Sequence, residues 1–263
     1  MYHFQSPWER LHWANDNAEK LKSLGSDITA NSKLSIVFDL QPETGNKIHK
    51  IVLDKKLPID ATRLVVEIIE HCRHALDQAV SAAWTQLSLG AIPKELNFPF
   101  TSCPKDFEGR LNISPLIKLT VIHDALRQIA PFPASQETGV GNGALCALNK
   151  AARCKHTINA KIAGKVVAAD FANGKLTGLV EGIKWPLHWD INEGHVIICT
   201  TSPEGQVDMD VKLDLAITVS GADRLDGGPV IENMFVILGA CVRAVKMIED
   251  AVISSAPTQS VVP

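Results

Sequence analysis

The longest stretch of apolar residues at helical spacing follows Asp60, a residue that can cap the start of a helix. The pattern continues to about Leu89, and Gly90 is placed to end the helix. We therefore predict a long amphipathic helix over residues 60–89 with a broad buried face. That face consists of Val65, Ile68, Ile69, Cys72, Ala75, Leu76, Ala79 and Ala83.

The same periodicity predicts four further helices. The first begins with Ser6 as N-cap and Pro7 at the first helical position, and Gly25 is placed to end it. Another begins with Ser114 as its cap and ends before Pro131. Its apolar stripe consists of Leu116, Leu119, Ile122, Leu126 and Ile129. The remaining two helices are expected at residues 144–156 and 231–253.

Other segments alternate between apolar and polar residues, which is typical of strands. Residues 34–39 and 47–53 flank a turn that contains Gly45, and this arrangement predicts a β-hairpin. Four later segments are separated by turn sequences such as Asn173-Gly174 and Glu204-Gly205, so we expect an antiparallel meander. These segments are residues 165–168, 175–180, 195–199 and 209–217.

Helices and strands occupy separate parts of the chain, which is typical of the α+β class. We predict a single α+β domain over residues 1–253. In it, a helical bundle layer packs with a sheet that is built from the N-terminal hairpin and the later meander. Residues 254–263 are expected to form a disordered tail.

The composition is that of an ordinary soluble globular protein. The 263 residues are 46% hydrophobic and 21% charged, and 26 Lys and Arg against 29 Asp and Glu leave a formal net charge of −3. This balance argues against a general nucleic-acid binder, because such proteins carry a surplus of Lys and Arg that neutralises phosphates. Neither a transmembrane helix nor a signal peptide is predicted.

Six cysteines are scattered along the chain without a C-x-x-C pair, so no zinc site is expected. Most of them have apolar neighbours in sequence, which is typical of reduced, buried thiols in a cytoplasmic protein. We therefore expect a cytoplasmic location. The six residues are Cys72, Cys103, Cys146, Cys154, Cys199 and Cys241.

Polar residues gather on one face of the helix at residues 60–89. Glu70, Arg73, His74 and Asp77 are three or four positions apart, so their side chains are neighbours on the helix surface. A carboxylate beside an imidazole can form a proton-transfer site near neutral pH. The alternative is a polar stripe whose pairs stabilise the helix by about 0.2–0.5 kcal/mol each.

A third interpretation of this face is a metal site. His71 and His74, together with Glu67 and Glu70, offer nitrogen and oxygen ligands. Their spacing differs from H-E-x-x-H and from the E-x-x-H motif of di-metal bundles, so we predict no metal ligand. A metal-dependent enzyme that uses His71 and His74 is kept as an alternative.

A second polar cluster lies near the C-terminal end of the fourth predicted helix. Lys150, Arg153, Lys155 and His156 either complement the helix dipole or bind a phosphate or carboxylate group. Arg153 and Lys155 are our candidate anion-binding residues. The glycine-rich residues 139–143 follow no strand and lack the lysine of a phosphate-binding loop, and no cofactor is predicted.

Four short motifs follow one another between residues 60 and 157. Arg73, Ala75, Leu76 and Asp77 match a helix motif H-N-L-R-S-A-L-D-H, and Phe98-Pro99 matches an F-P stretch. Pro131-Phe132 matches a Q-P-[FY] segment, and Lys155-His156 matches the motif N-x-x-K-H-R. In this order they resemble a large family of bacterial and phage-associated proteins. Glu70, His71 and Gln78 depart from the first motif, where that family has His, Asn and His, and Ala152 and Thr157 depart from the last.

The R-x4-H spacing of that family is similar to that of HEPN ribonucleases, helical proteins of toxin and antiphage systems that cleave RNA without metal. The resemblance implies that Arg73 stabilises the phosphorane charge while a histidine moves the proton of the 2′-hydroxyl. Gln78 stands at the position of that histidine and cannot act as a general base. Either His74 or His156 replaces it in space, or the activity is absent.

We therefore predict a non-catalytic binding or accessory protein of bacterial or phage type, with RNA or a protein as the candidate partner. A homodimer is expected by analogy with HEPN-like sites, which commonly form across a dimer. The alternative is a HEPN-like, metal-independent endoribonuclease. Its catalytic residues would be Arg73, His74, Asp77 and His156, with Arg153 and Lys155 binding the anion.

Overall fold

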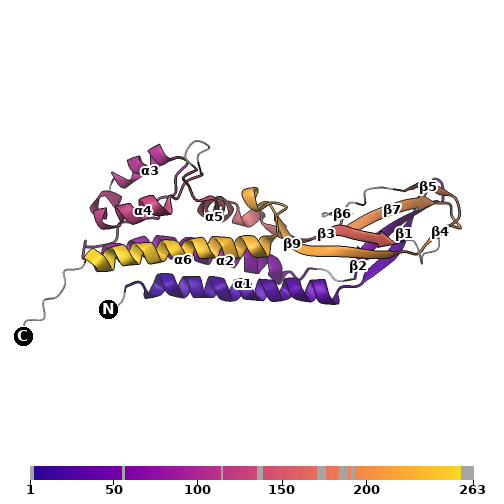
Figure 1. The fold of residues 1–263 in the computed structure, drawn as a ribbon, viewed down its shortest axis with the longest axis horizontal. Coiled ribbons are helices and arrows are strands. Elements are labelled where there is room, and N and C mark those ends of the chain that lie inside the picture. Colours follow the sequence, from indigo (N-terminus) through magenta and orange to yellow (C-terminus); the bar gives the residue numbers. More distant parts are fainter. Residues whose placement is uncertain are drawn as a thin grey trace, which may run out of the picture.

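The computed structural model describes residues 3–54, 57–113, 115–134, 139–170, 176–183, 187, 189–190 and 193–255. The molecule is elongated, with helices at one end and antiparallel strands at the other (Figure 1). This segregation confirms the predicted α+β class. The strands continue the long axis of the helices, so the two kinds of element lie largely end to end.

Three long helices form the centre of the helical part (Figure 1). They are α1 (Gln5–Asn31), α2 (Asp60–Gln86) and α6 (Val230–Ser255). Each is about 40 Å long at 1.5 Å per residue. Helix α2 contacts both α1 and α6, and all eight apolar residues predicted for its buried face are buried.

Helix α1 continues past Gly25, where the sequence predicts its end, and reaches Asn31. A Cβ atom on Gly25 would lie 2.6 Å from Cδ1 of Ile231, closer than real Cβ contacts. Glycine therefore lets α1 approach α6, and this contact offsets the roughly 1 kcal/mol by which glycine disfavours a helix interior. Ser6 also lies inside α1 rather than capping it, and its hydroxyl donates to Oε1 of Gln78 at 3.0 Å.

Three shorter helices lie on the side of α2 and α6 that is opposite α1, two of them in contact with α6 and the third farther out (Figure 1). They are α3 (Pro104–Leu111), α4 (His123–Ile129) and α5 (Gly143–Arg153). Short 3-10 segments accompany them at Leu116–Lys118, Thr120–Ile122, Lys155–Thr157 and Asp223–Leu225. The fourth predicted helix is thus confirmed as α5, although its last residues form a 3-10 turn.

The helix predicted between Ser114 and Pro131 is divided into two 3-10 turns and α4. Leu116, Leu119 and Ile122 are buried and lie three positions apart, which matches the 3.0 residues per turn of a 3-10 helix. The spacing of an α-helix begins only after Ile122. Ser114, the predicted cap, lies outside the described residues.

The strands form one larger sheet and two ribbons, all antiparallel. The sheet contains β1 (Leu34–Leu40), β2 (Lys47–Leu53), β7 (His195–Thr201) and β5 (Val180–Ile183) in that order, with β6 (Trp189–Asp190) also paired with β7. The ribbons pair β3 (Asn159–Asp170) with β9 (Asp210–Ser220), and β4 (Leu176–Thr177) with β8 (Gln206–Val207). The predicted hairpin is confirmed as β1 and β2.

The later strands pair in a nested order rather than as a sequential meander. β3 pairs with β9, β4 with β8, and β5 with β7, so the first strand of the series meets the last. Of the described strands after α5, β6 and β7 are the sequence neighbours that pair. An alternating pattern predicts a strand and its buried side but carries no information on its partner.

Two hydrophobic clusters form the interior. The larger lies among the helices and includes Ile68 of α2 and Ile217 of β9. The smaller lies in the sheet and includes Ile51 of β2 and Val196 of β7. Leu213, four residues before Ile217 on β9, packs against the smaller cluster. Strand β9 therefore connects the two clusters.

All six cysteines are described, and none forms a disulfide. Cys72, Cys146, Cys199 and Cys241 are buried, as we predict for most of them. Burial raises the pKa of Cys241 well above its ordinary value, and the neighbouring thiol of Cys72 raises it further. Cys241 is therefore a protonated thiol at neutral pH.

Some sequence predictions fall at or beyond the limits of the described residues. Residues 254 and 255 belong to α6, and the rest of the tail predicted at 254–263 lies outside the description. The turn predicted at Asn173-Gly174 lies outside it as well. None of the described helices is both long and apolar enough to cross a membrane. The single domain over residues 1–253 stays a prediction.

A buried histidine in the sheet links stability to pH. His49 of β2 is 3% exposed, and its Nε2 lies 2.9 Å from Oγ1 of Thr201. The Thr201 hydroxyl itself donates to the backbone oxygen of Ser202, so its oxygen accepts the Nε2–H of a neutral imidazole. Burial lowers the pKa of His49 from its ordinary value of 6.5, and the charge of Lys47 lowers it further.

We expect stability to fall as the pH drops below about 6.5, because the unfolded chain then binds a proton that folded His49 resists. Above this pH both states carry a neutral His49 and its contribution is complete. The measurement is the free energy of unfolding in urea between about pH 5 and pH 7.5. His49→Gln keeps a donor for Thr201 and should weaken the pH dependence; an unchanged dependence would contradict the assignment. Burial also lowers the pKa of His71, so part of the effect should remain.

Candidate functional site

Arg73 lies on the polar face of α2, where this face meets α5 and the connector between α2 and α3, residues 87–103. Its Cζ lies 4.3 Å from the centre of the Phe100 ring, a stacking distance for a guanidinium group. Its Nε lies 3.3 Å from Oδ2 of Asp77, one turn further along α2. Its Nη1 donates to Oδ1 of Asn149 on α5 at 3.4 Å. Arg73 is therefore held by three elements and is only 23% exposed.

Asp77 also has a structural contact. Its Oδ1 accepts a hydrogen bond from the backbone N–H of Phe98 at 2.9 Å, while its Oδ2 faces Arg73. Phe98 is 2% exposed, and its ring lies 4.8 Å from that of Phe100. Arg73 and Asp77 thus attach the connector to α2, as an ion pair of the kind the sequence predicts for a helix face.

The structure also brings Lys155 to α2. Its ammonium group donates to a carboxylate oxygen of Glu70, which lies one turn before Arg73. This hydrogen bond lowers the pKa of Glu70 despite the opposing effect of partial burial. Lys150 pairs in the same way with Asp223, at 2.6 Å. Two of the four basic residues predicted near the end of α5 therefore have carboxylate partners.

Arg153 has no such partner. Within the described part of the chain its side chain makes no ion pair or hydrogen bond, and this side chain is exposed. The same holds for Arg110, in the last turn of α3. Burial lowers the pKa of Arg73, and the positive charges of Arg153 and Arg110 lower it further, whereas Asp77 raises it. We call Arg73, Arg110 and Arg153 the arginine cluster.

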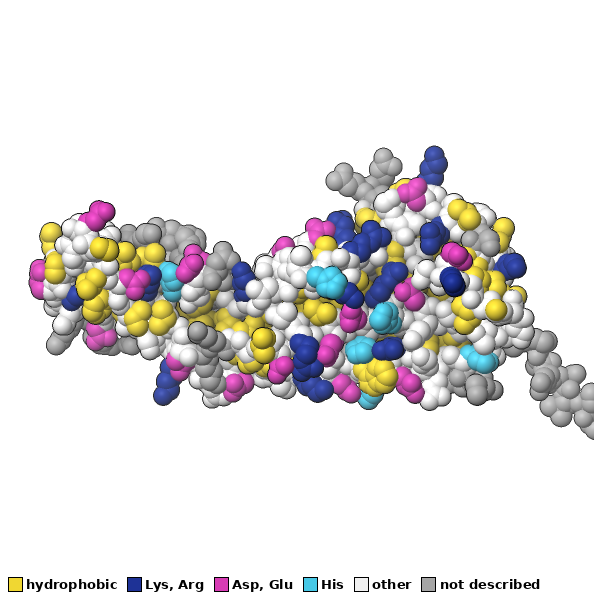
Figure 2. Space-filling view, turned by 180° about the vertical axis from the view of Figure 1, so that it is seen from behind, with side chains coloured by type: hydrophobic (Ala, Val, Ile, Leu, Met, Phe, Trp, Pro, Cys, Tyr) yellow, Lys and Arg dark blue, Asp and Glu magenta, His cyan; other side chains and the backbone are white. Residues whose placement is uncertain are grey.

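The arginine cluster has an excess of positive charge in a protein whose net charge is −3. The charges of three arginines from α2, α3 and α5 act together here, and Asp77 is the carboxylate that pairs with Arg73. Figure 2 shows Lys, Arg and His side chains gathered on one face of the helical part, interspersed with acidic ones. The positive charge is therefore a local feature of the surface.

The two histidines proposed as catalytic residues lie apart from these contacts. His74 is exposed on α2, and its charge acts on Glu70. His156 is exposed in the 3-10 turn after α5, and no hydrogen bond or ion pair among the described residues joins it to Arg73 or Asp77. Of the predicted residues, Arg73 and Asp77 are in contact and the charge of Arg153 acts on Arg73, whereas no described hydrogen bond or ion pair joins His74 or His156 to them.

His71 faces α1 instead of α5. Its Nδ1 lies 3.4 Å from Nη1 of Arg10, and its ring lies 5.5 Å from one ring of Trp13. Burial lowers the pKa of His71, with the charge of Arg10 as the next cause. Among the residues that the structure describes, no group of three His, Cys, Asp or Glu side chains is arranged to hold a metal ion.

Sequence reasoning missed three residues of this region. Asn149 lies four positions before Arg153, so the spacing on one helix face could have identified it. Phe100 and Arg110 gave no comparable pattern. Phe100 lies in an irregular connector, and Arg110 lies on α3, a helix of 8 residues that we did not predict.

Comparisons with known proteins find no match for this chain among protein families, curated proteins or solved structures. The resemblance to the bacterial and phage-associated family stays a prediction. Exposed guanidinium groups without a carboxylate partner are suited to binding an anion, in particular the oxygens of a phosphate group.

Proposed function

We propose that this protein is a non-catalytic binding protein whose ligand presents phosphate groups to the arginine cluster. The observation that carries the proposal is that the positive charges of two exposed arginines, Arg110 and Arg153, act on Arg73, while neither of their side chains has a carboxylate partner among the described residues. Like charges in proximity repel one another, and a bound anion relieves that repulsion.

The geometry of Arg73 supports binding rather than proton transfer. A general base must reach the proton it removes, within about 2.6–3.2 Å or through one water. The described groups that touch the Arg73 guanidinium are Asp77, Asn149 and the ring of Phe100. Asp77 is engaged by both Arg73 and a backbone N–H, so its carboxylate serves to hold structure.

Short single-stranded RNA is the probe that tests this proposal, because its backbone offers successive phosphates. We expect the double variant Arg110→Ala/Arg153→Ala to bind an RNA of about 12 nucleotides roughly tenfold more weakly than the wild type. The slope of log affinity against log salt should become shallower by about 1.4, since about 0.7 is lost for each phosphate contact to a single strand. Fluorescence anisotropy at about 50 mM and about 200 mM salt measures both quantities.

Arg63→Ala is the matched control. Arg63 is an arginine of α2 whose charge is already paired with Asp60 and Glu67, and it should leave RNA binding unchanged. Equal losses in this control and the double variant, or no binding by the wild type, would overturn the proposal.

The same reactions test the ribonuclease alternative. Labelled RNA incubated with EDTA should stay intact. Cleavage that disappears in folded Arg73→Ala and His156→Ala variants would instead support a HEPN-like enzyme with these residues at its centre. A bacterial or phage setting, a cytoplasmic location and a homodimer stay predictions from the sequence.

A further inference from the structure

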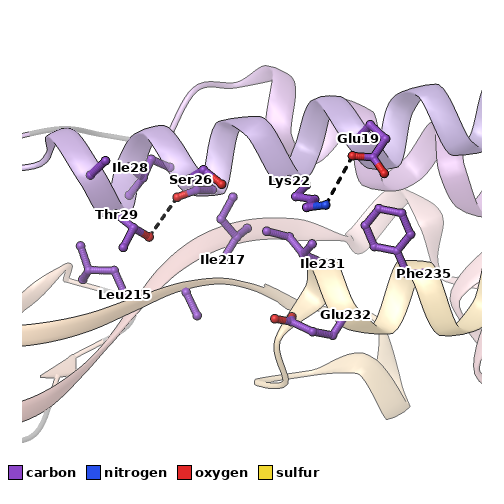
Figure 3. Close-up of a pocket in the computed structure, with 13 residues that line it drawn as sticks. Glu19, Lys22, Ser26, Ile28, Thr29, Leu215, Ile217, Ile231, Glu232 and Phe235 are labelled. Atoms are coloured by element: carbon purple, nitrogen blue, oxygen red, sulfur yellow. Dashed lines mark hydrogen bonds and ion pairs between the residues drawn. The ribbon is translucent and has the colours of Figure 1, made fainter.

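A groove between α1 and the junction of β9 with α6 exposes apolar surface in the helical part (Figure 3). Its volume is about 800 Å³, and its lining includes Ile217 and Phe235. The ammonium group of Lys22 lies 5.8 Å from the centre of the Phe235 ring and 3.7 Å from Oε2 of Glu19, so this cation already has a carboxylate partner. The groove therefore selects neither an anion nor a cation, whereas the strand β1 has a pattern that selects its partner.

Strand β1 forms one edge of the larger sheet, and no described strand pairs with its outer side. Its pairing with β2 continues just beyond both ends of the strand. The N–H of Asp54 donates to the backbone oxygen of Lys33 at 3.1 Å, and the N–H of Gln41 donates to that of Asn46 at 2.8 Å. Because hydrogen-bonded pairs alternate along an antiparallel strand, the odd-numbered residues of β1 bond to β2. The even-numbered residues therefore direct their N–H and C=O groups to the outer edge. These residues are Leu34, Ile36, Phe38 and Leu40.

This edge lacks the features with which proteins usually protect an exposed strand. Protected edge strands are short or bulged, or carry charged residues and proline. Strand β5, at the other end of the sheet, fits that description, with 4 residues, Glu181 among them, and a register shift against β7. Strand β1 has 7 residues and pairs with β2 without a shift. Asp39 is its one charged residue and forms an ion pair with Lys50. The outer edge of β1 is therefore open to another strand.

Apolar side chains on β1 are exposed on both faces of the sheet. Val37, on one face, is 38% exposed. On the other face, Phe38 is 50% exposed and Leu40 is 62% exposed. Leu34 and Ile36 share this second face and pack against the smaller hydrophobic cluster, but they remain half-buried. A further strand beside β1 would therefore remove apolar surface from water on both faces.

We propose that β1 pairs with β1 of a second copy of this chain, antiparallel and related by a two-fold axis that passes between the two Val37 residues. In this register all 7 residues of β1 pair, and even-numbered residues bond across the interface as their outward N–H and C=O groups require. Phe38 of each copy lies opposite Ile36 of the other, and Leu40 lies opposite Leu34. The exposed apolar side chains thus cover the half-buried ones.

The charges on β1 also fit a second copy. Ser35 of each copy lies opposite Asp39 of the other, so a hydroxyl donor faces each carboxylate and no like charges are directly opposed. One strand therefore meets every requirement of its own partner, in backbone phase, apolar contact and charge. The interface lies at the strand end of the molecule and does not involve the arginine cluster (Figure 1).

Sedimentation velocity between about 1 and 100 µM tests the proposal. A pair of short strands falls below the roughly 1,200 Å² of stable interfaces, so we expect a monomer–dimer equilibrium with a dissociation constant on the order of 10 µM. Val37→Glu should weaken the dimer at least about tenfold, because two glutamates would then face each other across the axis. Within the monomer, Lys50 lies opposite position 37 on β2 and gives the new carboxylate a counter-charge.

A charge exchange shows whether two copies of β1 meet at Val37. Val37→Lys alone should also be mainly monomeric, since it too opposes like charges. An equimolar mixture of Val37→Glu and Val37→Lys should dimerise again, to within about threefold of the wild type, because opposite charges then face each other. Val242→Glu is the matched control. Val242 is a 37% exposed valine on α6 with Lys246 one turn further along, and this variant should dimerise like the wild type.

A wild type that stays monomeric at about 100 µM would overturn the proposal. So would Val37→Glu and Val37→Lys variants that dimerise as well as Val242→Glu does. If both Val37 variants are folded by circular dichroism but their mixture stays monomeric, the two copies do not pair at Val37 and the proposal is wrong.

Discussion

Replacement of Arg73 by alanine is expected to lower the free energy of unfolding by about 2–4 kcal/mol. The variant loses the contact with the Phe100 ring, the hydrogen bond to Asn149 and the charge that faces Asp77. Asp77 is 25% exposed in its side chain, so its carboxylate would keep one backbone N–H and lose its counter-charge in a partly dry environment. Relief of repulsion with Arg110 and Arg153 offsets a small part of this loss.

Urea unfolding followed by far-UV circular dichroism measures the effect. Arg63→Ala is again the control, because Arg63 is exposed and its removal should change stability by no more than about 0.5 kcal/mol. The loss of stability in Arg73→Lys should lie between the losses in Arg73→Ala and Arg63→Ala. Lysine keeps the positive charge but lacks the flat guanidinium group that stacks on the ring and donates hydrogen bonds in several directions. If Arg73→Ala were as stable as the wild type, the structural role that we assign to Arg73 would be wrong.

Replacement of Ile51 by alanine in the sheet is expected to destabilise the helices as well as the strands. Ile51 is 1% exposed, and loss of a buried isoleucine side chain lowers stability by about 2–5 kcal/mol. Ile68→Ala in the helical cluster, at 0% exposure, should have a loss of the same size. If residues 1–253 form one cooperative domain, each variant should reduce the protection of amides in both α2 and β7 by the same free energy.

The physical basis of this coupling is the ribbon of β3 and β9. On β9, Ile217 packs among the helices while Leu213 packs against the sheet cluster. On β3, the backbone oxygen of Ile162 accepts a hydrogen bond from the indole of Trp189 at 3.0 Å, which joins β3 to β6. Unfolding of either cluster therefore removes packing contacts from β9, and the other cluster also packs against this strand.

Hydrogen exchange at increasing urea concentration, read by mass spectrometry, measures the two regions separately. Ile253→Ala is a useful control, because Ile253 is a 57% exposed isoleucine on α6 and its truncation should have little effect. Loss of protection in β7 alone for Ile51→Ala, with α2 unchanged, would divide the chain into two units and contradict the single-domain prediction.

The elements that could be predicted from the sequence are those with a strong local period. The buried face of α2 and the β1–β2 hairpin follow from spacing and from a glycine-containing turn, which act within a few residues. The end of α1 was misplaced because Gly25 has the local signature of a helix end. Its role is set by Ile231, more than 200 positions away along the chain.

The candidate site shows the same division between local and tertiary information. The position of Arg73 and Asp77 on one helix face could be predicted from their spacing, and the cluster of basic residues at the end of α5 could be recognised in the same way. The contact of Arg73 with Asn149 joins residues 76 positions apart, and the sequence offered no means to choose Glu70 as the partner of Lys155. These pairings depend on how α2, α3 and α5 pack.

By itself, then, the sequence determined the α+β class, the positions of the long helices and most strands, and the faces that would be buried. Periodicity is a local property of the sequence. Any arrangement that covers the apolar face of a helix or strand gains free energy by burying it, so the pattern predicts the element without its partner. The tertiary structure decided which strands pair and which charged and polar side chains from distant segments meet. Those outcomes depend on the relative placement of distant segments, and many placements satisfy the same local pattern.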